Sequence, residues 1–178
     1  MKRLGFDIDG VLYPWHQHIY DYLWMEGKVD VTYTYFWMNY LSFQHLIKPL
    51  LEDKYFYQVG EPYKGAVETV WRYAKDYSIA YITQRPKITE VITRRWLSLW
   101  EFPNTSSTLV LNDKAEYIAY HNFDYYVEDR AEYIHKIYDY TQVIGVRQPW
   151  NEDYFLDSLT KKILWINDIS ELPKVLEI

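Results

Sequence analysis

The sequence predicts an α/β fold in which a parallel sheet lies between two layers of helices and a small helical cap is inserted after the first strand. Strand-like and helix-like apolar stretches alternate over the last two thirds of the chain, which is typical of such a sheet. A short apolar stretch near the N-terminus ends at Asp7 and Asp9, where a strand would stop. The next strand that ends in a polar residue, at Thr83, follows after far more residues than one crossover needs, so a segment is inserted between them.

The first strand is predicted from the alternation of its side chains. Leu4, Phe6 and Ile8 recur at every second position, which is the period that one face of a strand requires. Gly10 permits the sharp turn with which this strand would end. The two carboxylates therefore lie where the chain leaves the sheet.

The inserted segment is predicted to be helical. Apolar and aromatic residues recur at helical spacing over residues 16–24, and Gly27 favours a stop after them. Residues 31–38 give two conflicting signals. Their β-branched and aromatic content favours a strand, whereas the spacing of their apolar residues favours a helix, and we expect a helix. Ser42 is expected to cap a further helix, which Pro49 would kink or end. These assignments divide the chain into an α/β core over residues 1–13 and 63–178 and a helical cap over residues 14–62.

From residue 63 onward the pattern alternates between helix and strand. Helices are expected over residues 63–76, from Pro86 along the apolar stripe of Ile88, Val91, Ile92, Trp96 and Leu99, after a cap at Asn112 or Asp113, around Ile134 and Ile137, and over residues 169–176. Strands are expected over residues 78–82, 108–111, 125–127, 142–146 and 162–166. This order implies a Rossmann-like, three-layer α/β/α fold with a doubly wound parallel sheet.

Polar residues follow successive strands of the predicted sheet. They are Asp7 and Asp9, then Thr83, then Lys114 at a helix start, and then Glu128 and Asp129. In open α/β sheets the carboxyl ends of the strands form the ligand-binding edge, so these side chains are expected to lie close together. Two carboxylates on one tight turn repel each other unless a proton or a cation lies between them, and a hard divalent cation would resolve that conflict.

Each of these residues also has an ordinary structural interpretation. Thr83 alone is more often a helix cap before Pro86. Lys114 alone would be a solvated lysine, although a cation at a helix start opposes the helix dipole unless an anion is near. Residues 128–130 alone would read as a surface charge run. The order of these residues, each at a strand end, favours the functional interpretation.

Taken together, the residues resemble the four motifs of the haloacid dehalogenase-like hydrolase superfamily. The first motif is Asp7-Ile8-Asp9-Gly10-Val11, the second is Tyr81-Ile82-Thr83, the third is Lys114, and the fourth is Glu128-Asp129. The resemblance implies that Asp7 attacks phosphorus to form an aspartyl-phosphate, and that Asp9 protonates the leaving alkoxide and then activates water. The implied cofactor is Mg²⁺, with ligands from Asp7, the carbonyl of Asp9, Asp129 and Glu128. The implied phosphate-binding residues are Thr83 and Lys114. Gln84 and Arg85 directly follow the second motif and are further candidates for phosphate binding, with stacking on a base as the alternative for Arg85.

The substrate is expected from the cap and from one further segment. The size of the cap, the Glu128-Asp129 motif and the segment Pro149-Trp150-Asn151 are similar to the 5'-nucleotidase branch, which includes pyrimidine deoxyribonucleotidases. That resemblance implies hydrolysis of a nucleoside monophosphate, carrying a 5'- or 3'-phosphate. Aromatic cap residues would form the pocket for its base, namely Tyr13, Trp15, Tyr20, Trp24, Tyr33, Phe36 and Trp37. The alternatives are a sugar phosphate phosphatase, a polynucleotide end phosphatase and a non-catalytic interaction module.

Composition limits the partners. The net charge of −6 across 178 residues argues against an extended nucleic-acid partner, because such binding needs clustered Lys and Arg. The absence of cysteine excludes disulfides, thiolate zinc sites and a cysteine nucleophile, and it favours a cytoplasmic location. No segment approaches 18 uncharged apolar residues, and Asp7 interrupts the first apolar run, so neither a membrane span nor a signal peptide is expected. His16, His18, His45, His121 and His135 show no metal-site spacing, and structural roles are expected for them.

Overall fold

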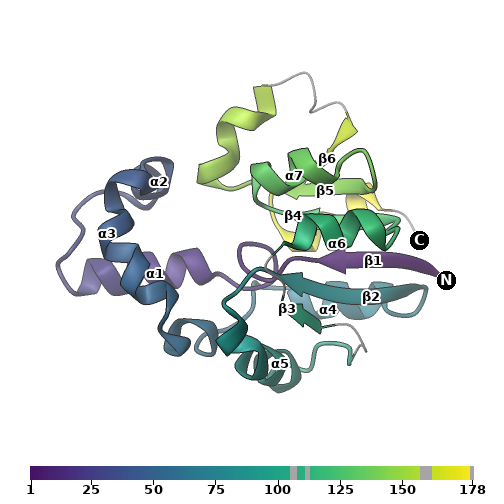
Figure 1. The fold of residues 1–178 in the computed structure, drawn as a ribbon, viewed down its shortest axis with the longest axis horizontal. Coiled ribbons are helices and arrows are strands. Elements are labelled where there is room, and N and C mark those ends of the chain that lie inside the picture. Colours follow the sequence, from purple (N-terminus) through teal and green to yellow (C-terminus); the bar gives the residue numbers. More distant parts are fainter. Residues whose placement is uncertain (105–107, 111–112, 157–161, 177–178) are drawn as a thin grey trace.

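A six-stranded parallel sheet forms the centre of the described structure (Figure 1). The computed structural model describes residues 1–178 except 105–107, 111–112, 157–161 and 177–178. The strands are β1 (Lys2–Phe6), β2 (Tyr77–Thr83), β3 (Thr108–Val110), β4 (Tyr125–Glu128), β5 (Gln142–Val146) and β6 (Leu164–Ile166), in the order β3-β2-β1-β4-β5-β6. The chain moves outward from β1 to β3 and then crosses back to β4, so the strand order reverses between β1 and β4, where such folds bind ligands.

Helices cover both faces of this sheet, which confirms the predicted three-layer α/β/α fold. On one face lie α4 (Ala66–Tyr73), α5 (Glu90–Leu99) and α8 (Leu172–Val175), and on the other lie α6 (Lys114–Tyr120) and α7 (Ala131–Ile137). The strand side chains alternate between the two: Leu4 and Tyr81 pack in the first layer, whereas Ile82 and Tyr126 pack in the second. Short 3₁₀ helices precede two of these helices, η2 (Lys87–Thr89) before α5 and η5 (Ile169–Glu171) before α8.

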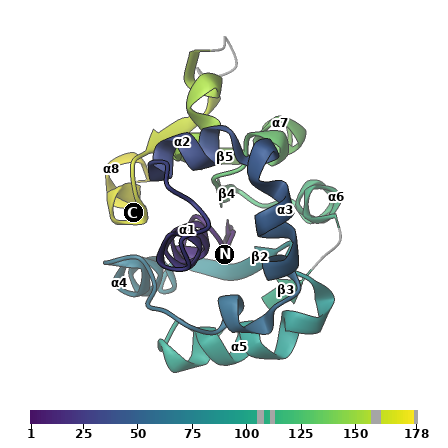
Figure 2. The same ribbon diagram turned by 90° about the vertical axis from the view of Figure 1, so that its left-hand side faces the viewer.

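A helical insert, which we define as residues 14–62, lies beyond the carboxyl ends of the strands (Figures 1 and 2). It contains α1 (Trp15–Met25), α2 (Tyr33–Met38), α3 (Tyr40–Leu51) and the 3₁₀ helix η1 (Lys54–Tyr57). The helix that we expected over residues 31–38 is α2, and the side chain of Thr32 caps it by accepting a hydrogen bond from the backbone of Tyr35 at 3.3 Å. The chain after β5 forms η3 (Pro149–Leu156), which packs against α2.

The predicted start of the third insert helix was wrong. Helix α3 begins at Tyr40, with Asn39 at the N-cap position, so Ser42 lies inside its first turn and does not cap it. The helix continues past Pro49 to Leu51. Sequence spacing could not locate this start because α2 ends at Met38 and α3 follows after a single residue.

The predicted apolar stripe of α5 was wrong in part: Trp96 is buried and Ile92 packs against the core, but three other members of the stripe do not. The helix buries Thr93, Trp96 and Leu97 toward the sheet, whereas Ile88, Val91 and Leu99 are exposed. Thr93 accepts a hydrogen bond from the buried guanidinium of Arg85 at 3.1 Å, so a polar residue occupies the inward face. Apolar periodicity alone therefore assigns the wrong face of this helix to the sheet, because it does not allow for an inward polar residue.

Two helix ends in the core follow from local chemistry. Helix α4 is shorter than the expected range 63–76, since Gly65 precedes it with a left-handed φ of 80°. Asp113 caps α6 by accepting a hydrogen bond from the backbone of Ala115 at 3.1 Å, while the alternative cap Asn112 lies outside the described residues. Within the described ranges, no helix is both long enough and apolar enough to cross a membrane.

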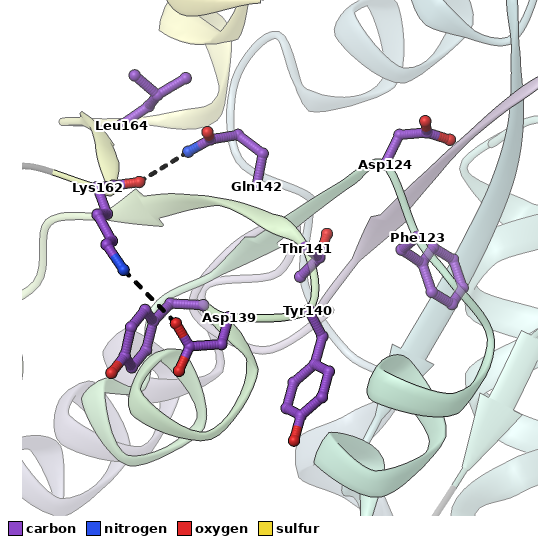
Figure 3. A pocket seen from close by; sticks show the side chains of 9 residues that line it. Phe123, Asp124, Asp139, Tyr140, Thr141, Gln142, Lys162 and Leu164 are labelled. Carbon is purple, nitrogen blue, oxygen red and sulfur yellow. Dashed lines mark hydrogen bonds and ion pairs between the residues drawn. The ribbon is translucent and has the colours of Figure 1, made fainter.

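A cavity of about 490 Å³ opens at the amino ends of β4, β5 and β6 (Figure 3). We call it the amino-edge cavity. Its wall includes Thr141, Gln142 and Leu164, together with Asp139 and Lys162. It lies at the opposite edge of the sheet from Asp7 and the other residues selected from the sequence.

Candidate active site

The turn after β1 brings the first carboxylates to the carboxyl edge of the sheet. The carbonyl of Ile8 accepts hydrogen bonds from the backbones of Leu12 and Tyr13, each at 2.8 Å, which closes a tight loop around Gly10. Gly10 has a φ of 81°, and a Cβ added there would lie 2.3 Å from Oδ2 of Asp129. The glycine therefore permits both the turn and the close approach of the Asp129 carboxylate.

Lys114 joins two buried carboxylates. Its Nζ lies 2.6 Å from Oδ2 of Asp7 and 2.8 Å from Oε2 of Glu128, and all three side chains are almost fully buried. Although burial lowers the pKa of Lys114, the two carboxylates raise it above its usual value. Burial raises the pKa of Asp7 to about 6, with Lys114 opposing that rise. Lys114 is a cation at the start of α6, where the helix dipole is unfavourable to it, and the carboxylates of Asp7 and Glu128 compensate for this.

Asp7, Glu128 and Asp129 form a buried acidic cluster whose ligand oxygens all lie within 4.8 Å of one another. Among the described residues, Oδ1 of Asp129 has no hydrogen-bond partner although it is buried. Burial raises the pKa of Asp129 well above its usual value, and the neighbouring Glu128 and Asp7 raise it further. An unpaired buried oxygen beside two more carboxylates fits a hard divalent cation, which takes oxygen ligands and relieves this repulsion.

The segment after β5 supports the acidic cluster, although the sequence indicated no contact of this kind. Trp150 donates from Nε1 to Oδ2 of Asp129 at 3.0 Å, and Gln148 donates to the carbonyl of Gly10 at 2.9 Å. Asn151 donates to the carbonyls of Asp129 and Val146. Two signals in the sequence pointed to this segment: its position directly after a predicted strand at the same edge of the sheet, and the resemblance of Pro149-Trp150-Asn151 to the 5'-nucleotidase branch. Neither signal indicated which groups these side chains would contact.

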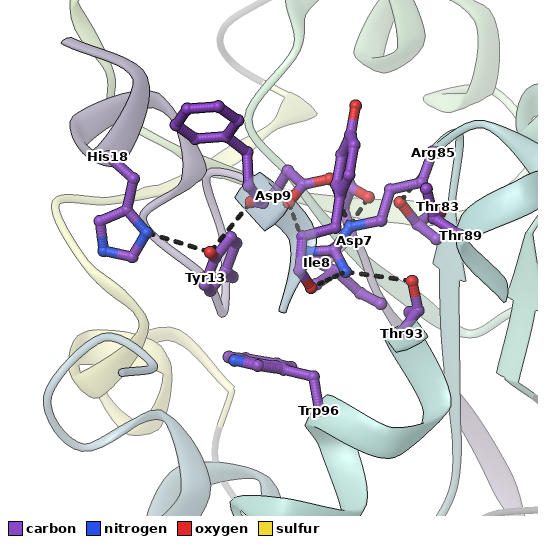
Figure 4. A network of polar contacts seen from close by, with 12 residues as sticks. Asp7, Ile8, Asp9, Tyr13, His18, Thr83, Arg85, Thr89, Thr93 and Trp96 are labelled. Carbon is purple, nitrogen blue, oxygen red and sulfur yellow. Dashed lines mark hydrogen bonds and ion pairs between the residues drawn. The ribbon is translucent and has the colours of Figure 1, made fainter. Parts of the chain in front are cut away.

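Asp9 does not join the acidic cluster through its side chain; it pairs with Arg85 instead (Figure 4). Nε of Arg85 donates to Oδ2 of Asp9 at 2.8 Å, and Nη2 donates to Oδ1 at 2.6 Å. Burial raises the pKa of Asp9, while the guanidinium opposes that rise. Thr83 lies beside this pair, with its hydroxyl accepting a 3.3 Å hydrogen bond from the backbone of Arg85.

Two adjoining cavities open at this edge of the sheet. The smaller, about 110 Å³, is the polar cavity, and its wall includes Asp7, Asp9, Thr83, Gln84, Arg85 and Lys114. The larger, about 500 Å³, is the aromatic cavity, and its wall includes Trp37, Tyr40, Gln44, Lys48 and Trp150. Trp15, His16 and Arg130 belong to both walls, so the cavities are neighbours.

Aromatic stacking shapes the boundary between the cavities. The ring of His16 stacks on Trp150 with centroids 3.9 Å apart, and it meets Trp37 edge-on at 4.8 Å. Burial lowers the pKa of His16 to about 3, helped by Arg130, so its imidazole is neutral at physiological pH. Of the insert aromatics selected from the sequence, Trp15 and Trp37 line the aromatic cavity, whereas Trp24 is exposed.

The comparisons of sequence give one informative relative. No protein-family model matches the chain. A curated protein of Oceanobacillus iheyensis, named "Putative nucleotidase OB0422", is 31% identical over 147 residues, which cover 73% of this chain and 78% of that protein. An identity of this size over most of both chains indicates common descent.

Solved structures share the whole fold. The haloacid dehalogenase-like hydrolase SP0104 from Streptococcus pneumoniae superposes with a TM-score of 0.65 at 12% identity, covering 98% of both chains. A HAD family hydrolase from Deinococcus radiodurans, with bound phosphate and sodium, gives 0.63 at 14% identity, covering 98% of this chain and 94% of that one. YfnB from Bacillus subtilis, bound to magnesium, gives 0.62 at 13% identity and 99% coverage of both. At such identities the likeness establishes the fold.

Proposed function

This chain belongs to the haloacid dehalogenase-like hydrolase superfamily, and we propose that it is a magnesium-dependent phosphatase that hydrolyses a nucleoside monophosphate. One observation carries the proposal. A small polar cavity, with carboxylates and a buried lysine in its wall, adjoins a larger aromatic cavity across Trp15, His16 and Arg130. A phosphate group would occupy the first, and the base of the leaving nucleoside the second.

At the phosphate end, Asp7 is the proposed nucleophile. Its Oδ1 accepts a hydrogen bond from the backbone of Ile8 at 2.8 Å and its Oδ2 accepts one from Lys114, so the carboxylate is held in one orientation. Attack forms a bond from the Asp7 carboxylate to phosphorus while the ester P–O bond breaks. Lys114 and Thr83 would stabilise the charge on the phosphoryl oxygens.

Asp9 is the proposed proton carrier in both steps. It would give its proton to the leaving oxygen as the ester bond breaks. It would then take a proton from the water that attacks the aspartyl-phosphate, which releases inorganic phosphate and restores Asp7. Each proton that Asp9 donates in the first step is therefore recovered in the second.

The acidic cluster is the proposed magnesium site, with Asp7 and Asp129 as carboxylate ligands, Glu128 beside them and the Asp9 carbonyl completing the protein donors. When bound, Mg²⁺ neutralises negative charge on the phosphoryl oxygens and on the carboxylates around them. Trp150 positions the Asp129 carboxylate by donating a hydrogen bond to it. Gly10 leaves the space that this carboxylate occupies, because it has no Cβ.

At the other end, the aromatic cavity suits a nucleobase. Its volume of about 500 Å³ lies within the range that small-molecule sites usually occupy. Trp15, Trp37 and Trp150 provide flat apolar faces, and the neutral imidazole of His16 adds a hydrogen-bonding group without a charge. The name of the Oceanobacillus relative supports the same substrate class.

A substrate panel with Mg²⁺ tests the proposal. Nucleoside 5'- and 3'-monophosphates, with ribose and deoxyribose, are compared with sugar phosphates and with p-nitrophenyl phosphate. We expect the largest kcat/KM for a nucleotide and loss of turnover when EDTA removes the metal. Rapid turnover of sugar phosphates without turnover of nucleotides would overturn the nucleotidase assignment, and no turnover of any phosphate ester would overturn the phosphatase assignment.

A matched pair of tryptophan variants tests the base pocket. Trp37→Ala removes a wall of the aromatic cavity, whereas Trp24→Ala removes an exposed tryptophan outside it. We expect Trp37→Ala to raise KM for the nucleotide about tenfold, the value of one lost stacking contact, with little change for p-nitrophenyl phosphate. Equal KM values for the two variants would place the base elsewhere.

A further inference from the structure

Arg85 is a buried arginine that pairs with Asp9 and Thr93 (Figure 4). Among the described residues, its three nitrogens donate four hydrogen bonds. Two reach the carboxylate of Asp9, one reaches Oγ1 of Thr93 at 3.1 Å, and one reaches the carbonyl of Tyr57 at 3.4 Å. The rings of Tyr13 and Tyr57 each lie 5.2 Å from the guanidinium carbon. A guanidinium has five N–H groups, so little donor capacity remains for a substrate phosphate.

The pairing with Asp9 fixes the orientation of that carboxylate. Both oxygens of Asp9 accept hydrogen bonds from the planar fork of Arg85, at 2.6 and 2.8 Å. A bidentate pair sets the plane of the carboxylate as well as its position, which a lysine at the same place would not do. An aspartate without this partner would be free to turn about its side-chain bonds.

Arg85 is itself held by three separate parts of the chain. It follows β2, it donates to Thr93 on α5, and it donates to Tyr57 on η1 of the helical insert. Tyr13, whose ring faces the guanidinium, donates through its hydroxyl to the carbonyl of Phe56 at 3.0 Å. The orientation of Asp9 therefore depends on how the insert packs on the core.

We propose that Arg85 is a positioning residue that aims the Asp9 carboxylate at the leaving-group oxygen and at the attacking water. This inference rests on the proposed phosphatase function and replaces the phosphate-binding role that the sequence suggested for Arg85. In the first step the P–O bond of the ester breaks and its oxygen takes the proton of Asp9. The carboxylate that results is the form that accepts hydrogen bonds from both Nε and Nη2 of Arg85. In the second step this carboxylate takes a proton from water.

The dependence of rate on the leaving group separates positioning from general structural support. A nucleoside leaves as an alkoxide and needs the proton, whereas p-nitrophenol leaves readily without one. If Arg85 aims Asp9, Arg85→Met lowers kcat/KM for the nucleotide about 100-fold and for p-nitrophenyl phosphate less than about fivefold. Arg85→Lys loses nearly as much on the nucleotide, because it keeps the charge without the fork.

Guanidinium rescue and a matched control complete the experiment. Millimolar guanidinium added to Arg85→Ala is expected to restore part of the nucleotide rate. The control is Arg94→Met, which removes a half-exposed arginine of α5 that pairs with Glu90 at 3.0 Å, and it should change neither rate. The rate on p-nitrophenyl phosphate also reports that each variant has folded.

The outcomes separate this inference from the function on which it rests. Equal loss on both esters in Arg85→Met, an unchanged nucleotide rate or a higher one overturns the positioning role. A loss that appears mainly as a higher KM for both esters indicates phosphate binding and overturns it too. Asp9→Asn provides the reference: if it shows the leaving-group pattern and Arg85→Met does not, Arg85 alone is misassigned. If wild type hydrolyses neither ester, the proposed function fails as well.

Discussion

At the carboxyl edge of the sheet, Lys114 is buried within 2.8 Å of two carboxylates, whereas at the amino edge Lys162 reaches Asp139 at 3.6 Å in the open. The side chains of Lys162 and Asp139 are 66% and 61% exposed, compared with 1% for Lys114. Both edges carry a cavity of similar size, about 500 Å³ for the aromatic cavity and 490 Å³ for the amino-edge cavity. Cavity volume alone therefore does not distinguish them.

The two edges differ in whether their charged side chains are buried or exposed. A buried ion pair must overcome the loss of hydration of both groups, and apolar residues in its place are often as stable or more so. Asp7 and Asp129 have raised pKa values because burial disfavours their charged forms, which is an added cost at neutral pH. A protein has little structural reason to gather such groups, so their concentration at one edge points to chemistry there.

The largest difference between the two edges is expected when one carboxylate is removed from each. Asp7→Asn keeps the shape of the side chain and removes the proposed nucleophile, so we expect kcat to fall at least about 10³-fold. Asp139→Asn makes the same change at the amino-edge cavity, where we expect kcat within about twofold of wild type. Steady-state assays with a nucleotide and Mg²⁺ measure both. Full activity in Asp7→Asn would exclude the covalent mechanism.

A lysine exchange tests the difference in stability. Lys114→Met leaves Asp7 and Glu128 buried without their cation, and we expect it to lower the free energy of unfolding by about 3 to 5 kcal/mol. Lys162→Met removes an exposed pair and should cost less than about 1 kcal/mol. Urea unfolding in EDTA measures both values. Similar losses at the two edges would mean that burial does not set the energetics of these pairs.

Much of the carboxyl edge could be predicted because its signals are local. A strand that ends in a polar residue can be recognised from a few consecutive positions. Parallel strands then place their carboxyl ends, and these polar residues, at the same edge of the sheet. Asp7, Thr83, Lys114 and Asp129 reach one cavity or cluster for this reason. The same local signals predicted the order of strands and helices in the core.

The pairing of side chains could not be predicted in the same way. The partner of Arg85 depends on where α5 and η1 pack, and nothing within a few residues of Arg85 indicates Asp9. Trp150 reaches Asp129 only after β5 has been placed beside β4. The error in the inward face of α5 has the same origin, since Thr93 turns inward to meet a guanidinium from another element.

A pH series with and without Mg²⁺ tests the acidic cluster more finely. Burial raises the pKa of Asp7 from 3.8 to about 6, so between these values the folded chain holds a proton that the unfolded chain has lost. In EDTA the contribution of Asp7 to stability is therefore present below about pH 4 and lost as pH rises through 6.

Metal binding should have the opposite dependence, because Mg²⁺ needs the ionised carboxylate. We expect Mg²⁺ to raise Tm at about pH 7.5, and its affinity to fall up to about tenfold per pH unit below 6. Thermal unfolding at several Mg²⁺ concentrations measures this. An equal Tm increase at about pH 5 and pH 7.5 would mean that Asp7 is not a ligand of the metal.

The smallest expected effect is that of Thr141→Val at the amino edge, whose buried oxygen has a counterpart in Asp129 at the carboxyl edge. Oδ1 of Asp129 and Oγ1 of Thr141 are both buried without a hydrogen-bond partner among the described residues. If the first oxygen is kept for a cation, Asp129→Asn should abolish the Mg²⁺-dependent increase in Tm. Thr141→Val should leave activity unchanged and alter stability by no more than about 1 kcal/mol, in the stabilising direction, because it removes an unpaired hydroxyl at constant shape. Urea unfolding and the nucleotide assay report both variants. A marked loss of activity in Thr141→Val would show that an unpaired oxygen at the amino edge also serves the reaction, and the contrast between the two edges would no longer hold.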